Sequence, residues 1–228
     1  PMGASATRIP AKELAPMGRS YNAPSFTCGL PMTKHYDEAY FQHWYRRSDI
    51  GGPQRLARKA GLAVACAEYY LERPIRTVLD IGCGEGAWRA PLMKLRPKLR
   101  YLGFDSSEFA IAKHGPRRNL HYAHFGDFSQ LRPCPPVDLL VCADVLHYLP
   151  TRELQRGLPG LAELCGGVAY LETFAREDEF EGDHAGFQPR TAAWYRKQFN
   201  AHGLQSVGSH CWLAPALAEQ VAALEMGA

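Results

Sequence analysis

Three glycines at alternate positions follow an apolar run in the stretch Val78–Trp88, which reads VLDIGCGEGAW. Glycine has no Cβ, so the backbone at Gly82, Gly84 and Gly86 can turn sharply and come close to a bound molecule. Where such a loop opens a helix, the free N–H groups favour an anionic group on the ligand. The stretch therefore predicts a binding site for a nucleotide-like cofactor.

Three acidic residues accompany this loop and narrow the choice of cofactor. Asp105 ends the run LRYLGFD, where a carboxylate can accept two hydrogen bonds from a ribose. Asp80 stands two positions before the first glycine, where it would repel a pyrophosphate but suit an ammonium or a sulfonium. Asp127, in HFGDFSQL, suits the amino group of an adenine. Together they favour a cofactor without phosphates.

Composition and charge limit the class of protein. The chain has 228 residues, 46% hydrophobic and 21% charged, which suits one domain with a full core. The net charge is only +3 and the basic residues are scattered, which disfavours a nucleic-acid partner. Seven cysteines lack metal-ligand spacing, and no apolar run approaches the roughly 18 residues of a membrane span. We expect a soluble cytoplasmic protein without a metal or a membrane partner.

The elements that position the loop alternate between short apolar runs and helical stretches, which predicts an α/β fold with a parallel, doubly wound, Rossmann-like sheet. The predicted strands are Thr77–Ile81, Leu99–Phe104, Leu120–His124, Val137–Cys142, Gly167–Thr173 and a closing pair near Gln205–Trp212 and Glu219–Met226. The predicted helices between them are Gly86–Leu95, Ser106–Lys113, Thr151–Cys165 and Thr191–His202.

The chain before this alternation divides into two parts. Residues 1–31 are rich in Pro, Gly, Ala and Ser, which predicts a disordered or extended tail. Residues 32–74 predict a helical lid, made of an aromatic helix from Tyr36 to Tyr45 and a second helix over Gln54–Leu71. The tail is thus followed by a domain over 32–228, with the lid at 32–74 and the Rossmann-like core at 75–228.

The motifs VLDIGCGEGAW, LGFDSS, GDF and VDLLVCADVLHYLP resemble, in order and spacing, those of class I S-adenosylmethionine-dependent methyltransferases. Within that family the chain is most similar to the small-molecule branch of methyltransferase types 11 and 25. The resemblance implies a seven-stranded sheet, mostly parallel with a reversed last hairpin, and S-adenosyl-L-methionine as cofactor. It implies methyl transfer to a small-molecule acceptor.

The resemblance also implies roles for individual residues. Ribose binding falls to Asp105 beside Ser106, and adenine contacts fall to Asp127 and Phe128. Contacts to the methionine end fall to the loop that holds Asp80, Gly82, Cys83 and Gly84, and to the Ala143 region. Tyr36 and Tyr40 either contact the cofactor or pack the aromatic helix against the sheet.

His147, in CADVLHYL, follows the fourth predicted strand and is the candidate general base. A helix-start histidine that only caps or packs is the alternative, and Tyr148 stands where many relatives carry their histidine. The acidic stretch FAREDEFEGDHAGFQ is either a solvated loop or an active-site lid.

Two other functions stay open at this stage. The glycines also fit the looser G-x-G-x-x-G/A pattern of a nicotinamide-dependent oxidoreductase, although Asp80 and Asp127 disfavour it. A non-catalytic protein that binds S-adenosylmethionine is the second alternative, because methyl transfer from a sulfonium has no obligatory catalytic residue.

Overall fold

Strands and helices alternate along the chain from Thr77 to Leu213 in the computed structural model, which describes residues 37–44, 52–180 and 183–222. The described residues fall within one unit, Lys34–Ala228. The strands are β1 (Thr77–Ile81), β2 (Arg100–Asp105), β3 (Leu120–Tyr122), β4 (Val137–Ala143), β5 (Cys165–Glu172), β6 (Gln205–Gly208) and β7 (Cys211–Leu213). The helices are α1 (Glu38–Trp44), α2 (Pro53–Leu71), α3 (Arg89–Leu95), α4 (Glu108–Arg118), α5 (Thr151–Leu164), α6 (Ala192–Ala201) and α7 (Pro215–Ala218), with a 3₁₀ turn, η1 (Phe125–Ser129).

The strands form a seven-stranded sheet in the order β3-β2-β1-β4-β5-β7-β6. β1 to β5 pair in parallel, and β7 runs antiparallel to both β5 and β6. The predicted fold class, a doubly wound Rossmann-like sheet with a reversed last hairpin, is therefore confirmed.

The last predicted strand is wrong. The closing hairpin lies within Gln205–Leu213, where Ser209 and His210 form the turn, both with positive φ. α7 and a turn follow at Pro215–Gln220, so residues 219–222 are not a strand, and 223–226 lie outside the described residues. Pro215 explains the difference, because proline favours the first turn of a helix and lacks the N–H that a strand would donate.

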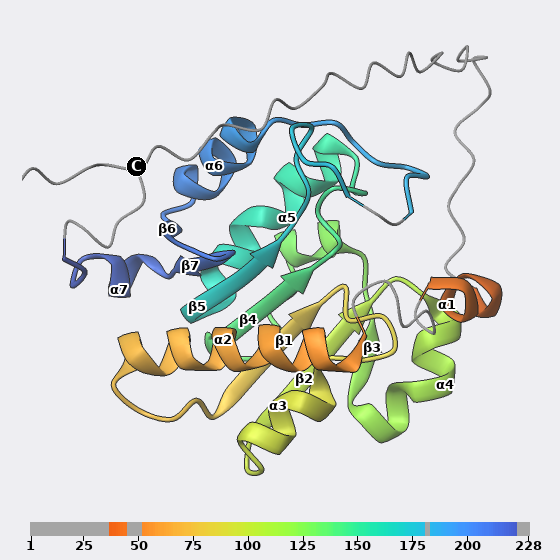
Figure 1. The fold of residues 1–228 in the computed structure, drawn as a ribbon, viewed down its shortest axis with the longest axis horizontal. Coiled ribbons are helices and arrows are strands. Elements are labelled where there is room, and N and C mark those ends of the chain that lie inside the picture. The colour runs from red at the N-terminus through yellow and green to blue at the C-terminus, as the bar shows by residue number, and fades with distance from the viewer. Residues whose placement is uncertain (1–36, 45–51, 181–182, 223–228) are drawn as a thin grey trace, which may run out of the picture. The chain divides into compact units, whose positions relative to one another are not determined.

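Helices cover both faces of the sheet (Figure 1). α2 and α3 pack on one face, through residues such as Val64 and Leu92, and α5 and α6 pack on the other, through residues such as Leu158 and Phe199. The central strand β4 shows why both faces are apolar: its residues alternate between the two cores, and all but the last are buried.

The sheet order places a topological switch point between β1 and β4. β2 and β3 continue outward from β1 on one side, and β5 continues outward from β4 on the other. In open α/β sheets, ligands bind beside such a point, at the carboxyl ends of the strands. The residues that follow β1, β2, β4 and β5 are therefore the ones to examine.

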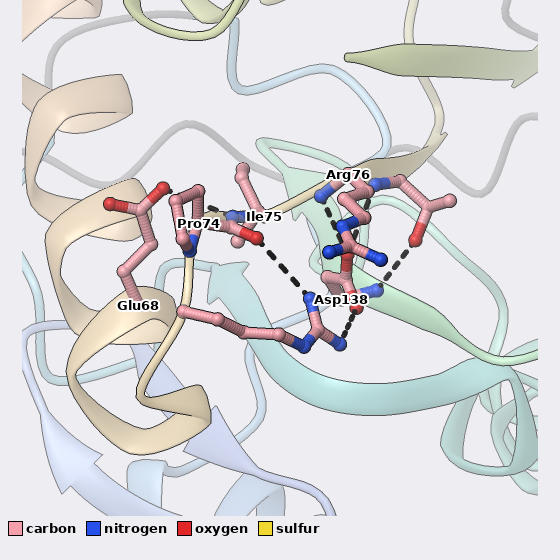
Figure 2. Close-up of polar contacts among 7 residues, drawn as sticks. Glu68, Pro74, Ile75, Arg76 and Asp138 are labelled. Carbon is pink, nitrogen blue, oxygen red and sulfur yellow. Dashed lines mark hydrogen bonds and ion pairs between the residues drawn. The ribbon is translucent and has the colours of Figure 1, made fainter. Parts of the chain in front are cut away.

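At the amino ends of the strands, Asp138 near the start of β4 bonds the neighbouring segment in place (Figure 2). Its carboxylate accepts hydrogen bonds from Arg73 Nη2 at 2.7 Å, from the Arg76 N–H at 2.6 Å and from the Thr77 N–H at 3.2 Å. Asp138 returns its own N–H to Thr77 Oγ1 at 3.0 Å. These bonds fix the connection between α2 and β1 to the neighbouring strand.

Glu68 of α2 secures the same connection from the helix side. Its carboxylate accepts the Ile75 N–H at 3.0 Å and forms an ion pair with Arg96, which lies just after α3. The segment that leads into β1 is thus bonded to α2 and to β4. Its position sets where β1 and the glycine loop begin.

We expect Asp138→Ala to lower the free energy of unfolding by about 2 kcal/mol, because three part-buried hydrogen bonds lose their acceptor. Burial alone would raise the pKa of Asp138, but the bonds from Arg73 and the backbone outweigh it and lower the pKa. The contribution is therefore complete above the unfolded pKa of about 4 and is lost as the pH falls through the lower folded value.

Urea denaturation at pH 7 and at pH 3 measures this difference. Glu163→Ala, which removes the surface ion pair with Arg132, is the matched control and should cost less than about 1 kcal/mol. Equal losses for the two variants would contradict the role of Asp138.

Candidate functional site

The glycine loop is bonded directly to the end of β2. The N–H groups of Gly82 and Cys83 both donate to the Phe104 carbonyl oxygen, at 2.7 and 3.0 Å. Gly82, Gly84 and Gly86 have φ values of 75°, 52° and 76°, in the region that favours glycine. A Cβ on Gly82 would lie 2.2 Å from Val145 Cγ2, so this position also lacks space for a side chain.

Asp105 ends β2 beside this loop, as predicted. Its Oδ2 accepts the Gly84 N–H at 2.7 Å and its Oδ1 accepts the Ser107 N–H at 2.8 Å. Burial raises the pKa of Asp105, while the N–H groups of Ser107, Gly84 and Ser106 act to lower it. Each carboxylate oxygen has a further lone pair for a ligand hydroxyl. Asp105 and Ser106 are both half-buried and so within reach of a ligand.

Asp80 lies beneath the loop, with its side chain turned into the protein. It is 1% exposed, and Tyr101 Oη donates to its Oδ2 at 2.5 Å. Burial raises the pKa of Asp80 to about 7; the Tyr101 hydrogen bond opposes this shift and the charge of Asp105 adds to it. Any effect of Asp80 on a ligand would therefore act through its charge rather than through direct contact.

Cys83 is also buried, and burial raises the pKa of its thiol, so the thiol stays neutral. Both of its backbone groups are used within the protein: the N–H donates to the Phe104 carbonyl oxygen, and the carbonyl oxygen accepts the Gly86 N–H at 2.8 Å.

The predicted adenine contacts lie in η1. Asp127 is exposed, and its Oδ2 accepts the His124 N–H at 2.9 Å, which fixes the start of the turn. Phe128 is fully buried: its ring packs edge-on against Phe104, and its carbonyl oxygen accepts a hydrogen bond from Arg132. An open hollow of about 430 Å³ borders Asp127, and it is lined by Gly126, Asp127, Ser129, Gln130, Leu131 and Arg156.

A cluster of charged residues that the sequence did not predict lies on the β4 side of the switch point. Glu172 ends β5 next to Ala143, its register partner in β4, and its carboxylate binds Lys59 Nζ of α2 at 2.6 Å. The N–H of Asp144 donates to the Glu172 carbonyl oxygen at 2.9 Å, and Asp144 has a left-handed φ of 59°. Lys59, Asp144 and Glu172 thus gather around the predicted methionine-end residue Ala143.

Asp144 is the titratable member of this group. Its side chain reaches solvent, but it lies in a recess where protein atoms surround it on most sides. That burial and the neighbouring Glu172 raise the pKa of Asp144 to about 6, while Lys59 and Arg55 of α2 act to lower it. The recess therefore carries both carboxyl groups and cations.

A signal for two of these residues was present in the sequence. Asp144 and Glu172 follow the rule that selected Asp105, an acid at the carboxyl end of a strand. Lys59 gives no such signal, because its partner is 113 positions away.

The predicted base, His147, is 1% exposed. Its Nδ1 lies 3.3 Å from Thr173 Oγ1 and accepts the Phe174 N–H at 3.4 Å. The structure thus places His147 under the segment that follows β5, and its proposed role as a base stays a prediction.

Within the predicted aromatic helix, the structure describes α1, which contacts α4. Phe41 stacks on Phe109 with ring centroids 6.0 Å apart, and Glu38 pairs with Lys113 at 3.1 Å. α1 therefore lies near the start of α4, which follows Asp105 (Figure 1). Tyr40 is half-buried in α1, whereas Tyr36 lies outside the described residues.

Two absences concern the described residues alone. In residues 37–44, 52–180 and 183–222, no group of three or more His, Cys, Asp and Glu side chains could hold a metal ion. Within the same ranges, no helix is long and apolar enough to cross a bilayer.

We expect Gly82→Ala to lower the free energy of unfolding by about 2 kcal/mol, because alanine at a φ of 75° is strained and its Cβ overlaps Val145. Gly61→Ala in α2 is the matched control: its Cβ meets no atom within 4 Å, so the substitution should raise stability by up to about 1 kcal/mol. Thermal denaturation of both variants tests this contrast. A stable Gly82→Ala variant would show that the loop tolerates a side chain.

We expect Asp80→Asn to stabilise the fold at high pH. The folded pKa of about 7 lies above the unfolded value of about 3.9, so wild type loses stability as the pH rises between them. Asparagine carries no charge, and its oxygen can still accept the Tyr101 hydrogen bond. The gain should therefore grow from pH 4 to pH 7, reaching on the order of 2 kcal/mol.

Urea denaturation of wild type and Asp80→Asn at pH 5 and pH 8 measures this gain. Glu163→Gln, a change at an exposed carboxylate, serves as the control. A difference that does not vary with pH would contradict the burial argument.

Comparison with known proteins bears on the family of the domain. Residues 79–167 match a family model described as a methyltransferase domain. The chain is 34% identical over 132 residues to a trans-aconitate 2-methyltransferase of Deinococcus radiodurans, which covers 51% of this chain and 49% of the relative. It is 30% identical over 125 residues to a malonyl-[acyl-carrier protein] O-methyltransferase of Bacillus cereus, which covers 53% and 45%.

Among solved structures, the fold is similar to a magnesium protoporphyrin IX methyltransferase of Synechocystis PCC 6803 with bound SAH. The TM-score is 0.54 at 22% identity, over 74% of this chain and 86% of that one. At this identity the likeness concerns the fold. The alignments with the two curated relatives span about half the length of those proteins.

The match over residues 79–167 favours a methyltransferase over the nicotinamide-dependent oxidoreductase that the glycine pattern left open. The resemblance predicted from the motifs is confirmed over residues 79–167, which match a methyltransferase domain.

Proposed function

We propose that this protein transfers a methyl group from S-adenosylmethionine to a small-molecule acceptor. The observation that carries the proposal is the carboxylate of Asp105, which is bonded to the glycine loop and keeps lone pairs for a ribose diol. The neighbouring charges agree, since Asp80 and Asp144 would attract the ammonium and sulfonium of this cofactor.

We assign the cofactor contacts as follows. Asp105 and Ser106 hold the ribose, and the exposed Asp127 accepts from the adenine amino group. Phe128, also predicted to contact the adenine, is fully buried, so we propose that it supports η1 beneath Asp127. The backbones of Gly82, Cys83, Gly84 and Ala143 form the site for the methionine end, and Tyr36 and Tyr40 remain proposed contacts from the aromatic helix.

When bound, the cofactor supplies an electrophilic methyl group on a sulfonium. The chain's own contribution is alignment, which is worth roughly 7 to 11 kcal/mol of barrier for well-oriented reactants. The glycine loop and Asp105 fix the cofactor from the β1 side of the switch point. Lys59, Asp144 and Glu172 border the β4 side, where the acceptor must approach.

We further propose that the acceptor is a carboxylic acid methylated on oxygen. The two curated relatives are named for trans-aconitate and for malonyl groups, both derived from carboxylic acids, and the second is named an O-methyltransferase. Arg55 and Lys59, one turn apart on α2, supply cations at the same edge. A carboxylate is already deprotonated near neutral pH, so such an acceptor needs no general base.

The remaining parts of the proposal rest on the sequence. We propose a lid at residues 32–74 over a core at 75–228, preceded by a tail at 1–31. We also propose a cytoplasmic location and no nucleic-acid partner, from the cysteine pattern and the scattered basic residues.

Calorimetric titration with S-adenosylhomocysteine and, separately, NADH tests the cofactor. Wild type should bind the former and not the latter. Asp105→Ala should weaken binding by at least about tenfold, which corresponds to about 1.4 kcal/mol. Glu163→Ala, far from the loop on α5, should bind as wild type does. Binding of NADH alone would overturn the proposal.

Turnover is tested with S-adenosylmethionine and a panel of small di- and tricarboxylic acids, matched with amines of similar size. Formation of S-adenosylhomocysteine together with a methyl ester supports the acid acceptor. Methylation of the amines alone would contradict the acceptor class but leave the cofactor assignment intact.

A further inference from the structure

His147 and Tyr148, two consecutive residues after β4, form hydrogen bonds with a segment that follows β5. His147 is bonded to the start and the end of this segment, and Tyr148 is bonded to its middle. At its start, His147 Nδ1 is bonded to Thr173 and Phe174. At its end, the Gln188 N–H donates to the His147 carbonyl oxygen at 2.8 Å. Between them, Tyr148 Oη donates to the Asp183 carbonyl oxygen at 2.6 Å. We call residues 173–180 and 183–188 the aromatic segment.

The rings of this segment also gather on His147. The centroids of Phe174, Phe180 and Phe187 lie 5.3, 6.0 and 5.9 Å from the imidazole. Phe174 and Phe180 stack on each other at 4.5 Å, with 9° between their planes. The imidazole is therefore enclosed by rings of the segment, while its hydrogen bonds fix the backbone where the segment begins.

Two carboxylates of the aromatic segment accept hydrogen bonds from nearby backbone N–H groups. Asp178 Oδ2 accepts the Ala175 N–H at 2.8 Å, and Glu177 Oε2 accepts the Ala192 N–H at the start of α6 at 3.1 Å. These bonds shape the backbone on either side of the rings. Asp178 and Glu177 therefore have a structural role in this acidic stretch, which explains their presence without a bound ligand.

The hydrogen bonds at Nδ1 assign the tautomer of the neutral His147 ring. Because Nδ1 accepts the Phe174 N–H, the neutral imidazole carries its proton on Nε2. To act as a base, Nδ1 would have to give up both of its bonds at a site that is 1% exposed. This geometry suits a fixed acceptor of hydrogen bonds and does not suit a base that exchanges protons with a substrate.

We propose that His147 is a positioning residue, which sets the aromatic segment against the carboxyl ends of β4 and β5, where it forms the acceptor-side wall of the site. The inference rests on the proposed function, since that function places the acceptor at this edge. The segment begins at Thr173, directly after Glu172, so its position also determines what surrounds the Lys59–Glu172 pair.

Two substitutions separate positioning from base catalysis. His147→Asn keeps an acceptor near the Nδ1 position but removes the ring and its acid-base chemistry, whereas His147→Phe keeps the ring and removes the acceptor. Hydrogen exchange measured by mass spectrometry should show residues 173–180 within about threefold of wild type in His147→Asn. In His147→Phe they should exchange at least tenfold faster.

Tyr148→Phe provides a milder variant, since it deletes one hydroxyl group. It should speed exchange at residues 183–188 and leave 173–176 unchanged. The inference is overturned if His147→Phe and Tyr148→Phe both leave the segment's exchange as in wild type. It is equally overturned if His147→Asn matches His147→Phe.

Turnover with an acceptor found in the panel gives an independent readout. His147→Asn should keep kcat and the shape of the pH–rate profile, whereas loss of a general base would cost at least about 100-fold in both variants. Titration with S-adenosylhomocysteine separates the two claims: wild type that fails to bind it defeats the proposed function. Normal binding by both His147 variants, together with the exchange pattern above, supports the positioning role.

Discussion

The attachment of the glycine loop to the end of β2 is the constraint on which the rest of the site depends. One carbonyl oxygen, that of Phe104, accepts two loop N–H groups, and the carboxylate of Asp105 accepts a third. Two of the three donors, Gly82 and Gly84, have left-handed backbone, and Gly82 also lacks space for a Cβ. The loop, Asp105 and the buried Asp80 at the end of β1 therefore form one unit, and none of them can be moved alone.

This unit concentrates carboxyl groups where water is partly excluded. Burial raises the pKa values of Asp80, Asp105 and Asp144, so each resists ionisation in the free protein. A ligand with two positive charges would favour their ionised forms. The same carboxyl groups that destabilise the free protein near neutral pH would then contribute to cofactor binding, a common compromise between stability and function.

The sequence was sufficient for those features that arise from local patterns. The glycine loop and Asp105 follow from the positions of residues relative to one strand end, and the strand order agrees with the alternation of elements. Contacts between distant segments carried no comparable signal, which is why Lys59 and Glu172 were not found together. The burial of His147 was equally hidden, because it depends on a segment that begins 26 positions later. The last strand was misplaced because Pro215 favours a helix start at that point.

The match to the methyltransferase family model begins at residue 79 and ends at residue 167. Both limits separate residues that are bonded to each other in the structure. Lys59 and Glu172, which bind each other, lie outside opposite ends of the matched range. Asp138 lies inside it, while its partners Arg73, Arg76 and Thr77 lie before it. A fragment limited to residues 79–167 would keep the glycine loop but would leave the buried carboxylate of Asp138 without these partners. The unit that folds is therefore longer at both ends than the unit that sequence comparison recognises, and any transplant of this site into another protein must include α2 and the whole of β5.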